Sequence, residues 1–231
     1  MKIAIMGAMQ EEIAPLLEYF KEYTTMEFAN NKYYMTSYKG LKLIIAYSKI
    51  GKVNASLTAT TLIEKFGAQQ LFFSGVAGAV NPALKIGDLI VATKLVQHDV
   101  DISAFGHPYG FIPEGNVYTP TSQALRELVI NVAKKQRKEV LEGVIATGDQ
   151  FICDNAKKNW IQETFDADAI EMEGASVAVV CEALNVPFCI LRAISDAADM
   201  DAGFSFDTFL ETAAKESAAL MIALMDTLAH D

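Results

Sequence analysis

Short apolar and β-branched runs alternate with longer helical patterns along the whole chain. No repeat, low-complexity tract or linker rich in Pro, Gly or Ser interrupts the 231 residues, so we expect one domain over residues 1–231. Such alternation predicts an α/β fold around a central sheet. Strands are expected at residues 2–6, 33–38, 41–46, 70–73, 89–93, 142–146 and 188–193, with the second and third forming a hairpin. Helices are expected at residues 10–23, 53–66, 122–135, 156–165 and 173–185, followed by a C-terminal helix capped by Ser205.

The acidic balance of the chain limits its partners. The formal net charge is −10 at pH 7, whereas affinity for nucleic acids is built largely from Lys and Arg. No apolar run reaches the roughly 18 residues that a membrane-spanning helix needs. We therefore expect a small-molecule substrate, with neither a nucleic acid nor a membrane as a partner.

The cysteines indicate a reducing compartment. Cys153, Cys181 and Cys189 lie in apolar surroundings without CxxC spacing, which predicts buried reduced thiols rather than disulfides or a metal site. The first apolar run meets polar residues 10–12 too early for a secretory signal. We expect a cytoplasmic protein that holds no metal and no cofactor.

The three histidines add no metal signature. His98 and His107 flank a short acidic stretch at a spacing that matches no known metal site, so loop polarity is the expected role. His230 lies in the terminal tail and is expected to have no role.

Four segments carry polar residues or glycines where an apolar run ends, namely residues 7–12, 74–78, 171–175 and 192–196. In α/β sheets ligands bind beyond the carboxyl ends of strands, so these segments are the candidates for a site. Each has an ordinary alternative. Glu12 suits the first turn of a helix, Gly75 and Gly78 suit a turn, Glu171 and Glu173 suit the solvated start of a helix, and Asp196 suits a helix cap.

The carboxyl groups in these segments also suit acid–base and sugar chemistry. Asp196 follows an apolar run, and burial there would raise its pKa and keep it protonated as a general acid. Glu171 and Glu173 flank Met172, so one is expected to face a pocket and the other solvent. A carboxylate at such a position can accept hydrogen bonds from a sugar diol.

The order of the motifs along the chain is more specific than any one of them. It runs from MKIAIMGAMQEEI through SKIGKVNA, SGVAGAV, GDLIVAT, HDVDISAFGHPYGFIP, ATGDQFI and EMEGASVA to LRAISDAAD and SFDTFL. This series resembles the 5′-methylthioadenosine/S-adenosylhomocysteine nucleosidases of the purine nucleoside phosphorylase superfamily, over nearly the whole chain. The resemblance implies a three-layer α/β/α fold with a twisted mixed sheet. It also implies a hydrolase that releases adenine from 5′-substituted adenosines, and a homodimer with two active sites at its interface.

The resemblance implies roles for residues at the matching positions. Glu12 would activate water with the help of Arg192, Asp196 would protonate adenine N7 with the help of Ser195, and Glu173 would hold the ribose hydroxyls. Further substrate contacts are implied at Met9, Ile50, Val76, Ala77, Gly78, Phe151, Ile152, Met172 and Phe206 of the same subunit, and at Ile102, Phe105, His107 and Pro113 from a partner subunit.

Val76 departs from the family, whose members often carry Ser at this position. The hydroxyl that helps to hold the attacking water is then missing, so water positioning falls on Glu12 and Arg192. In Val76 and in the segment GHPYGFIP, which contains His107, the chain resembles a branch of the family. Members of that branch also cleave 6-amino-6-deoxyfutalosine in an alternative menaquinone pathway. The sequence does not rank that compound against methylthioadenosine, S-adenosylhomocysteine and 5′-deoxyadenosine.

Two other functions fit the same scaffold. A phosphate-dependent nucleoside phosphorylase needs cationic clamps, yet no Arg precedes Arg126, and apolar Met6 and Met9 flank the first glycine turn. A purine-binding protein without catalysis would have no need for Glu12, Glu173 and Asp196 together. Hydrolysis is therefore the expected reaction.

Overall fold

The computed structural model describes residues 1–199 and 201–229, so His230 lies outside the described part. The strands are β1 (Lys2–Gly7), β2 (Thr24–Phe28), β3 (Asn31–Tyr38), β4 (Leu41–Tyr47), β5 (Gln70–Ala79), β6 (Leu89–Gln97), β7 (Tyr118–Pro120), β8 (Val140–Thr147), β9 (Ala169–Glu171) and β10 (Phe188–Asp196). The helices are α1 (Gln10–Phe20), α2 (Lys52–Thr60), α3 (Gln123–Lys135), α4 (Asn155–Phe165), α5 (Gly174–Ala183) and α6 (Ala202–Leu228). A π-helical turn (Thr61–Lys65) continues α2, and a 3-10 turn (Ser103–Phe105) follows β6.

The strands form one mixed sheet, part of which closes on itself. β10 pairs parallel with β5 on one side and antiparallel with β6 on the other. β6 pairs with β8, β8 with β9, and β9 with β5, so five strands complete a barrel. From β5 the sheet continues through β1, β4, β3 and β2. The expected α/β class with a mixed central sheet is confirmed.

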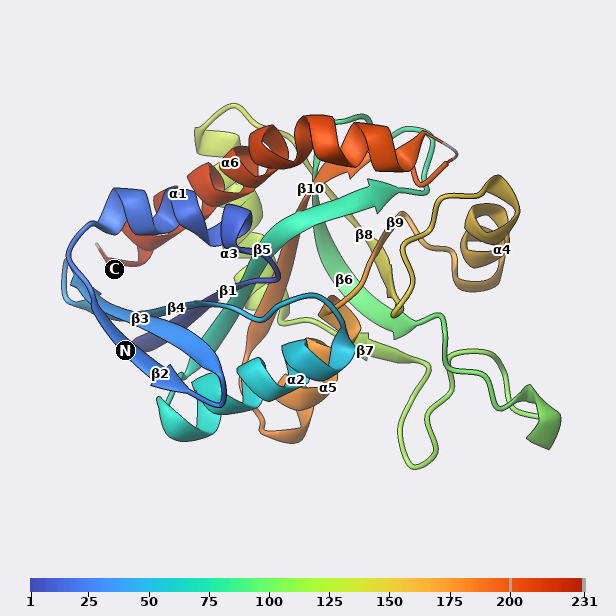
Figure 1. Ribbon diagram of the computed structural model, residues 1–231, viewed down its shortest axis with the longest axis horizontal. Helices are drawn as coiled ribbons and strands as arrows, with labels where there is room; N and C mark the ends of the chain where they lie inside the picture. The colour runs from blue at the N-terminus through green and yellow to red at the C-terminus, as the bar shows by residue number, and fades with distance from the viewer. Residues whose placement is uncertain (200, 230–231) are drawn as a thin grey trace.

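Helices cover both faces of this sheet (Figure 1). α1 and α6 lie on one face, and α2 and α5 lie on the other. The alternation of side chains along β1 explains this arrangement, because successive residues point to opposite faces. Ile3 and Ile5 pack with Ile13 of α1, whereas Ala4 packs with Ala59 of α2. A strand buried on both faces is apolar throughout, as β1 is.

Three short or exposed strands were not expected. β2 is exposed along its whole length at the edge of the sheet, so it shows no apolar alternation, and its presence ends the first helix at Phe20 instead of residue 23. β7 and β9 contain three residues each, too few to show a period.

Four further expectations were wrong in detail. The glycines at 75 and 78 lie inside β5, which continues to Ala79, and do not form a turn. Ser205 does not cap the last helix, because α6 already begins at Ala202. Cys153 is exposed, whereas Cys181 and Cys189 are buried. His98 is buried rather than part of a polar loop.

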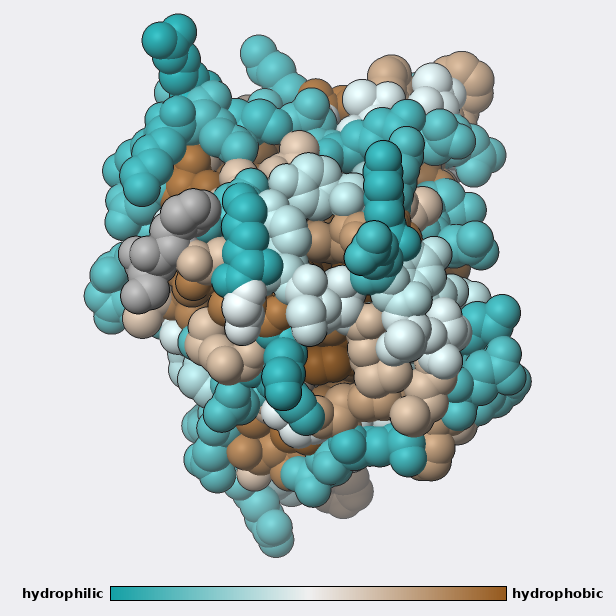
Figure 2. All heavy atoms as spheres, turned by 90° about the vertical axis from the view of Figure 1, so that its left-hand side faces the viewer, coloured by the Kyte–Doolittle hydropathy of each residue, from teal (hydrophilic) through white to brown (hydrophobic). Residues whose placement is uncertain are grey.

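The segment between β6 and β7 extends away from the body of the protein (Figure 1). It carries Phe105, whose side chain is 81% exposed. Hydrophilic side chains cover much of the face at the left of Figure 1, and the most hydrophobic ones show mainly in the hollows between them (Figure 2). Within residues 1–199 and 201–229, no helix is long and apolar enough to cross a membrane.

Candidate active site

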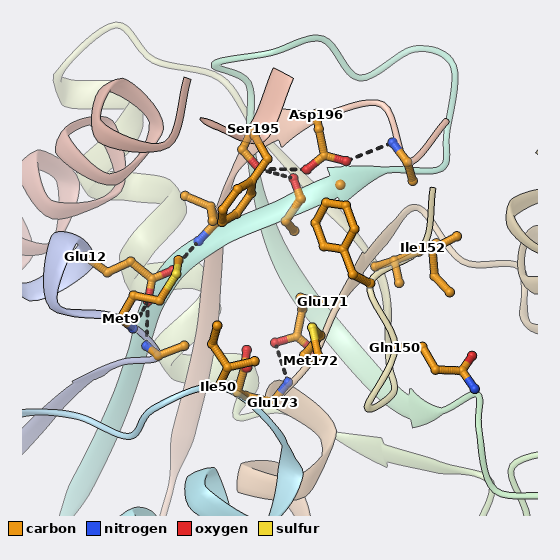
Figure 3. A pocket seen from close by; sticks show the side chains of 18 residues that line it. Met9, Glu12, Ile50, Gln150, Ile152, Glu171, Met172, Glu173, Ser195 and Asp196 are labelled. Carbon is orange, nitrogen blue, oxygen red and sulfur yellow. Dashed lines mark hydrogen bonds between the residues drawn. The ribbon is translucent and has the colours of Figure 1, made fainter. Parts of the chain in front are cut away.

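A cavity of about 310 Å³ opens where several strands end (Figure 3). This volume lies at the lower end of the range of about 300–1,000 Å³ for small-ligand sites. Its walls are formed by Ala8, Met9, Glu12, Ile50, Val76, Ala77, Gly78, Gln150, Phe151, Ile152, Ile170, Glu171, Met172, Glu173, Ser195, Asp196, Ala198 and Phe206. The structure therefore brings Glu12 and Asp196 to one cavity from opposite ends of the sequence.

Glu12 lies in the first turn of α1, and its side chain turns back toward the loop after β1. Its carboxyl accepts hydrogen bonds from the backbone N–H groups of Met9 and Val76, both at 2.9 Å, and of Ala8. Burial raises the pKa of Glu12, and the charge of Arg192 and these backbone donors oppose the rise. A buried carboxylate with a raised pKa is a stronger base than an exposed one, which suits the removal of a proton from water.

Asp196 ends β10 on the other side of the cavity. Its two oxygens accept hydrogen bonds from the Ser195 hydroxyl and from the backbone N–H of Ala198, both at 2.9 Å. Adjacent residues of a regular strand point to opposite faces, but a register shift between Ile194 and Asp196 interrupts the pairing with β5. The shift allows both Ser195 and Asp196 to line the cavity. Burial raises the pKa of Asp196, which favours its protonated form.

Two glycines of β5 provide room for these carboxyl groups. A Cβ atom added at Gly75 would lie 2.5 Å from Oε1 of Glu12, and one added at Gly78 would lie 2.6 Å from Oδ1 of Asp196. Both distances are shorter than any ordinary contact of a Cβ atom. The sequence indicated a turn at these glycines, whereas in the structure they lie within the strand and the acid side chains approach it.

Glu171 and Glu173 are both buried and both line the cavity. The expectation that one of them would face solvent was wrong. They lie where β9 passes into α5, and both of these elements belong to the core. Glu171 accepts hydrogen bonds from the Thr147 hydroxyl and the backbone N–H of Gly174. Glu173 accepts one from the backbone N–H of Gly51 at 2.9 Å. Burial, together with the charge of Glu171, raises the pKa of Glu173 to about 8.

Arg192 is fully buried behind Glu171 and is not among the residues that line the cavity. Its Nη2 lies 2.6 Å from Oε2 of Glu171, and its Nη1 donates to the carbonyls of Phe73 and Leu191. The guanidinium carbon also lies 4.0 Å from the centre of the Phe73 ring. With these contacts, the guanidinium reaches the cavity through Glu171 and through its charge.

Apolar residues form the remaining walls. The rings of Phe151 and Phe206 meet edge to face with centroids 5.7 Å apart. Phe151 is 46% exposed and Ile50 is 51% exposed, so this side of the cavity opens to solvent. The cavity is also lined by Ala8, Gln150, Ile170 and Ala198, none of which was expected to contact a ligand. The three apolar residues among them carry no sequence signal of their own.

Four of the expected site residues lie elsewhere. Ile102, Phe105, His107 and Pro113 belong to the extended segment between β6 and β7, and none of them lines the cavity of the same chain. The His107 ring stacks on Phe111 with centroids 4.7 Å apart.

Comparison with known proteins gives a consistent result. The family model described as the phosphorylase superfamily matches residues 2–226. The chain is 58% identical to the aminodeoxyfutalosine nucleosidase of Campylobacter jejuni over 99% of this chain and 100% of that one. It is 38% identical to the 5′-methylthioadenosine/S-adenosylhomocysteine nucleosidase of Anoxybacillus flavithermus, over 99% of each. The Helicobacter pylori nucleosidase of that name, solved with butyl-thio-DADMe-Immucillin-A, superposes with a TM-score of 0.97 at 50% identity and 98% coverage of both chains.

Proposed function

The chain belongs to the phosphorylase superfamily, and we infer from this membership and from its cavity that it is a nucleosidase. It hydrolyses the N-ribosidic bond of 5′-substituted adenosines and releases adenine. The observation that carries this inference is the pair of buried carboxyl groups, Glu12 and Asp196, on the wall of one cavity.

The mechanism follows from the charges that develop as the bond breaks. Positive charge forms on the sugar and negative charge on the departing base, as in other glycosidic cleavages. Asp196, whose protonated form is favoured by burial, donates its proton to N7 of the purine. Glu12 takes a proton from the water that attacks the sugar carbon. The glycosidic electron pair leaves with adenine, and the products are adenine and a 5-substituted ribose.

Glu173 is assigned to the ribose hydroxyls, with Met172 beside the sugar. The raised pKa of Glu173 favours the protonated form of its carboxyl group at neutral pH. Two sugar hydroxyls that donate to it would favour the ionised form. Glu171 and Arg192 form a buried ion pair behind this position, and Arg192 keeps the pKa of Glu12 from rising further.

Water fits this cavity as the nucleophile better than phosphate does. Within the described part of the chain, the residues that line it include four acidic side chains and no Lys or Arg. The nearby guanidinium of Arg192 is already paired with Glu171. An anionic phosphate would face this excess of carboxyl groups without a cationic partner. The absence of cationic lining therefore disfavours a phosphorylase.

The 5′-substituent is assigned to the open, apolar end of the cavity, formed by Met9, Ile50 and Phe206. The substrates that we propose are 5′-methylthioadenosine, S-adenosylhomocysteine, 5′-deoxyadenosine and 6-amino-6-deoxyfutalosine. The last is supported by the 58% identity to the aminodeoxyfutalosine nucleosidase of Campylobacter jejuni. Phe151 and Ile152, with the backbone of Ala77 and Gly78, are assigned to the purine.

We also propose a homodimer in which the segment carrying Ile102, Phe105, His107 and Pro113 closes the cavity of the partner. The proposal is supported by the extension of this segment from the body and by the exposure of Phe105 (Figure 1). Mixing Phe105→Ala with Asp196→Asn tests it. A mixed dimer would combine an intact acid with an intact partner segment, so recovery of activity on mixing is expected, and no recovery contradicts the shared site.

A cytoplasmic location is proposed as well. It is supported by the thiols of Cys181 and Cys189, which are unpaired and buried, as is common in reducing compartments. Cell fractionation tests this proposal.

The experiment for the activity uses purified protein, the four nucleosides, and buffers with and without phosphate. We expect adenine and a free sugar to form at the same rate in both buffers. Release that requires phosphate would identify a phosphorylase. Binding without release of a base from any of the four would identify a purine-binding protein.

A further inference from the structure

Three residues form a closed ring of hydrogen bonds beside the cavity. The backbone N–H of Lys52 donates to Oδ1 of Asp149 at 2.8 Å, and the backbone N–H of Asp149 donates to Oδ2 of Asp99 at 2.9 Å. Nζ of Lys52 lies 2.7 Å from Oδ1 of Asp99 and closes the ring. The ring joins the start of α2, the end of β6 and the loop after β8, which are separate parts of the chain.

We propose that Lys52, Asp99 and Asp149 are positioning residues that hold the ribose carboxyl and the purine wall in register with each other. The proposal rests on the proposed function, because it concerns the sites assigned to ribose and adenine. None of the three residues lines the cavity, so any effect on substrate must pass through Glu173 and Phe151.

The link to Glu173 runs through Gly51. The backbone N–H of Gly51 donates to Oε1 of Glu173 at 2.9 Å, and Gly51 directly precedes Lys52. Its φ of +97° is one that residues with side chains rarely adopt, and a Cβ atom there would lie 3.0 Å from Oδ1 of Asp149. Asp149 thus contacts the turn that holds Glu173. It also accepts from the first N–H of α2, whose own N-terminal residue supplies no side-chain cap.

The link to the purine wall runs through the loop after β8. Asp149 lies two residues before Phe151, whose ring is 46% exposed and rests against Phe206. Gly148 is fixed in turn, since its backbone N–H donates to the Glu171 carbonyl at 3.1 Å. A Cβ atom on Gly148 would lie 2.4 Å from the imidazole of His98. Residues 148 and 149 are therefore held in place, and they restrict the position of the exposed Phe151 that follows them.

The charges on Lys52 and Asp99 make the hydrogen bonds of the ring stronger than neutral ones would be. The side chains of Lys52 and Asp99 are only 18% and 14% exposed, which limits screening by water. Burial raises the pKa of Asp99, but the hydrogen bonds from Lys52 and from the Asp149 N–H, together with the charge of Lys52, outweigh it and hold the pKa below its ordinary value. Hydrogen bonds between charged groups are shorter and stronger than neutral ones.

The test compares Asp149→Ala with Asp149→Asn. Alanine removes the acceptor for the Lys52 N–H, whereas the asparagine carbonyl keeps it. We expect alanine to raise KM for 5′-deoxyadenosine, and the inhibition constant of adenine, about tenfold, as the loss of one charged hydrogen bond implies. The value of kcat should change less, because Glu12 and Asp196 are untouched. Asparagine should restore most of the affinity.

Glu142→Gln is the matched control. It breaks the ion pair of Glu142 with Arg126, whose N–O distance is 3.3 Å and which lies away from the cavity. The control should leave KM and the adenine constant unchanged. The melting temperature of each variant separates lost stability from lost positioning.

A KM and an adenine constant within twofold of the wild type in Asp149→Ala would overturn the proposal. A lower melting temperature with unchanged constants would overturn it too, because the ring would then serve only the fold. If Asp149→Ala does not fold, Asp99→Asn decides in the same way, since its amide nitrogen cannot accept one of the two ring bonds. A wild type that releases no adenine would contradict the proposed function instead, and adenine binding by the variants would still test the ring.

Discussion

Replacing Gly78 by alanine should slow the enzyme strongly, although Gly78 has no side-chain functional group. The new Cβ atom would lie 2.6 Å from Oδ1 of Asp196 and 3.2 Å from Cβ of Ala198. Ordinary contact begins at 3.4 Å, so the carboxyl group must move by about 0.8 Å. Such a move strains its hydrogen bonds to Ser195 and to the Ala198 N–H, which are both 2.9 Å long.

The size of the effect follows from the precision that proton transfer requires. A misplacement of about 1 Å can cost about 10²-fold in rate. A displaced Asp196 would also lose the alignment with N7 on which general acid catalysis depends. We therefore expect kcat of Gly78→Ala to fall about 10²-fold, with a smaller change in KM, since the sites assigned to ribose and the 5′-substituent are not altered.

Adenine release at saturating 5′-methylthioadenosine measures this effect, and thermal unfolding checks that the variant is folded. Gly203→Ala is the control, because an added Cβ atom meets nothing within 4 Å there. Alanine at this position in the first turn of α6 should leave kcat unchanged and should not lower the melting temperature. A kcat of Gly78→Ala within threefold of the wild type would refute the argument that Gly78 makes room for the acid.

Three further predictions concern the carboxyl groups. Asp196→Asn should lower kcat by about 10²–10⁴-fold without unfolding the protein, and near-normal adenine release would contradict the acid role. Glu173 has an ordinary pKa of 4.5 and a pKa of about 8 in the fold. Between these pH values the native state binds one more proton than the unfolded state, so the free energy of unfolding should fall as pH rises. Thermal melts of Glu173→Gln should show a flatter pH dependence than those of the wild type, and an equal slope would contradict the shift. Nζ of Lys158 lies 2.6 Å from the Ala197 carbonyl, and its charge opposes the rise that burial causes in the pKa of Asp196. Lys158→Gln should therefore move the alkaline limb of the kcat–pH profile to higher pH. An unmoved limb would show that the charge of Lys158 does not influence Asp196.

The class of the fold could be predicted from local patterns, but the closure of the sheet could not. Strands such as β1 are apolar throughout because both faces are covered, and this pattern is visible in the sequence. The barrel depends on β10 pairing with both β5 and β6. Those pairings join residues that are about a hundred positions apart, and no local pattern encodes their register.

The site could be predicted in part, because its residues follow strands, but their environments could not. Glu12, Glu173 and Asp196 were each open to an ordinary interpretation as a helix charge or cap. Burial separates the two interpretations, and burial is a property of the whole fold. Arg192 shows the same difficulty, since the sequence gives its charge but not that Glu171 and two carbonyls occupy its guanidinium.

The glycines of β5 are a sequence signal for the position of the two carboxyl groups. Glycine weakens the interior of a strand, so its presence there indicates a bulge or the close approach of another group. Gly75 and Gly78 lie in an otherwise apolar, buried strand, and each faces one of the two carboxyl groups assigned to proton transfer. Their three-residue spacing places one glycine beside Glu12 and the other beside Asp196, on opposite sides of the strand's mean plane. A pair of strand glycines at odd spacing therefore fits a strand that passes between an acid and a base, and in this protein the interruption of the apolar run is what leaves space for both.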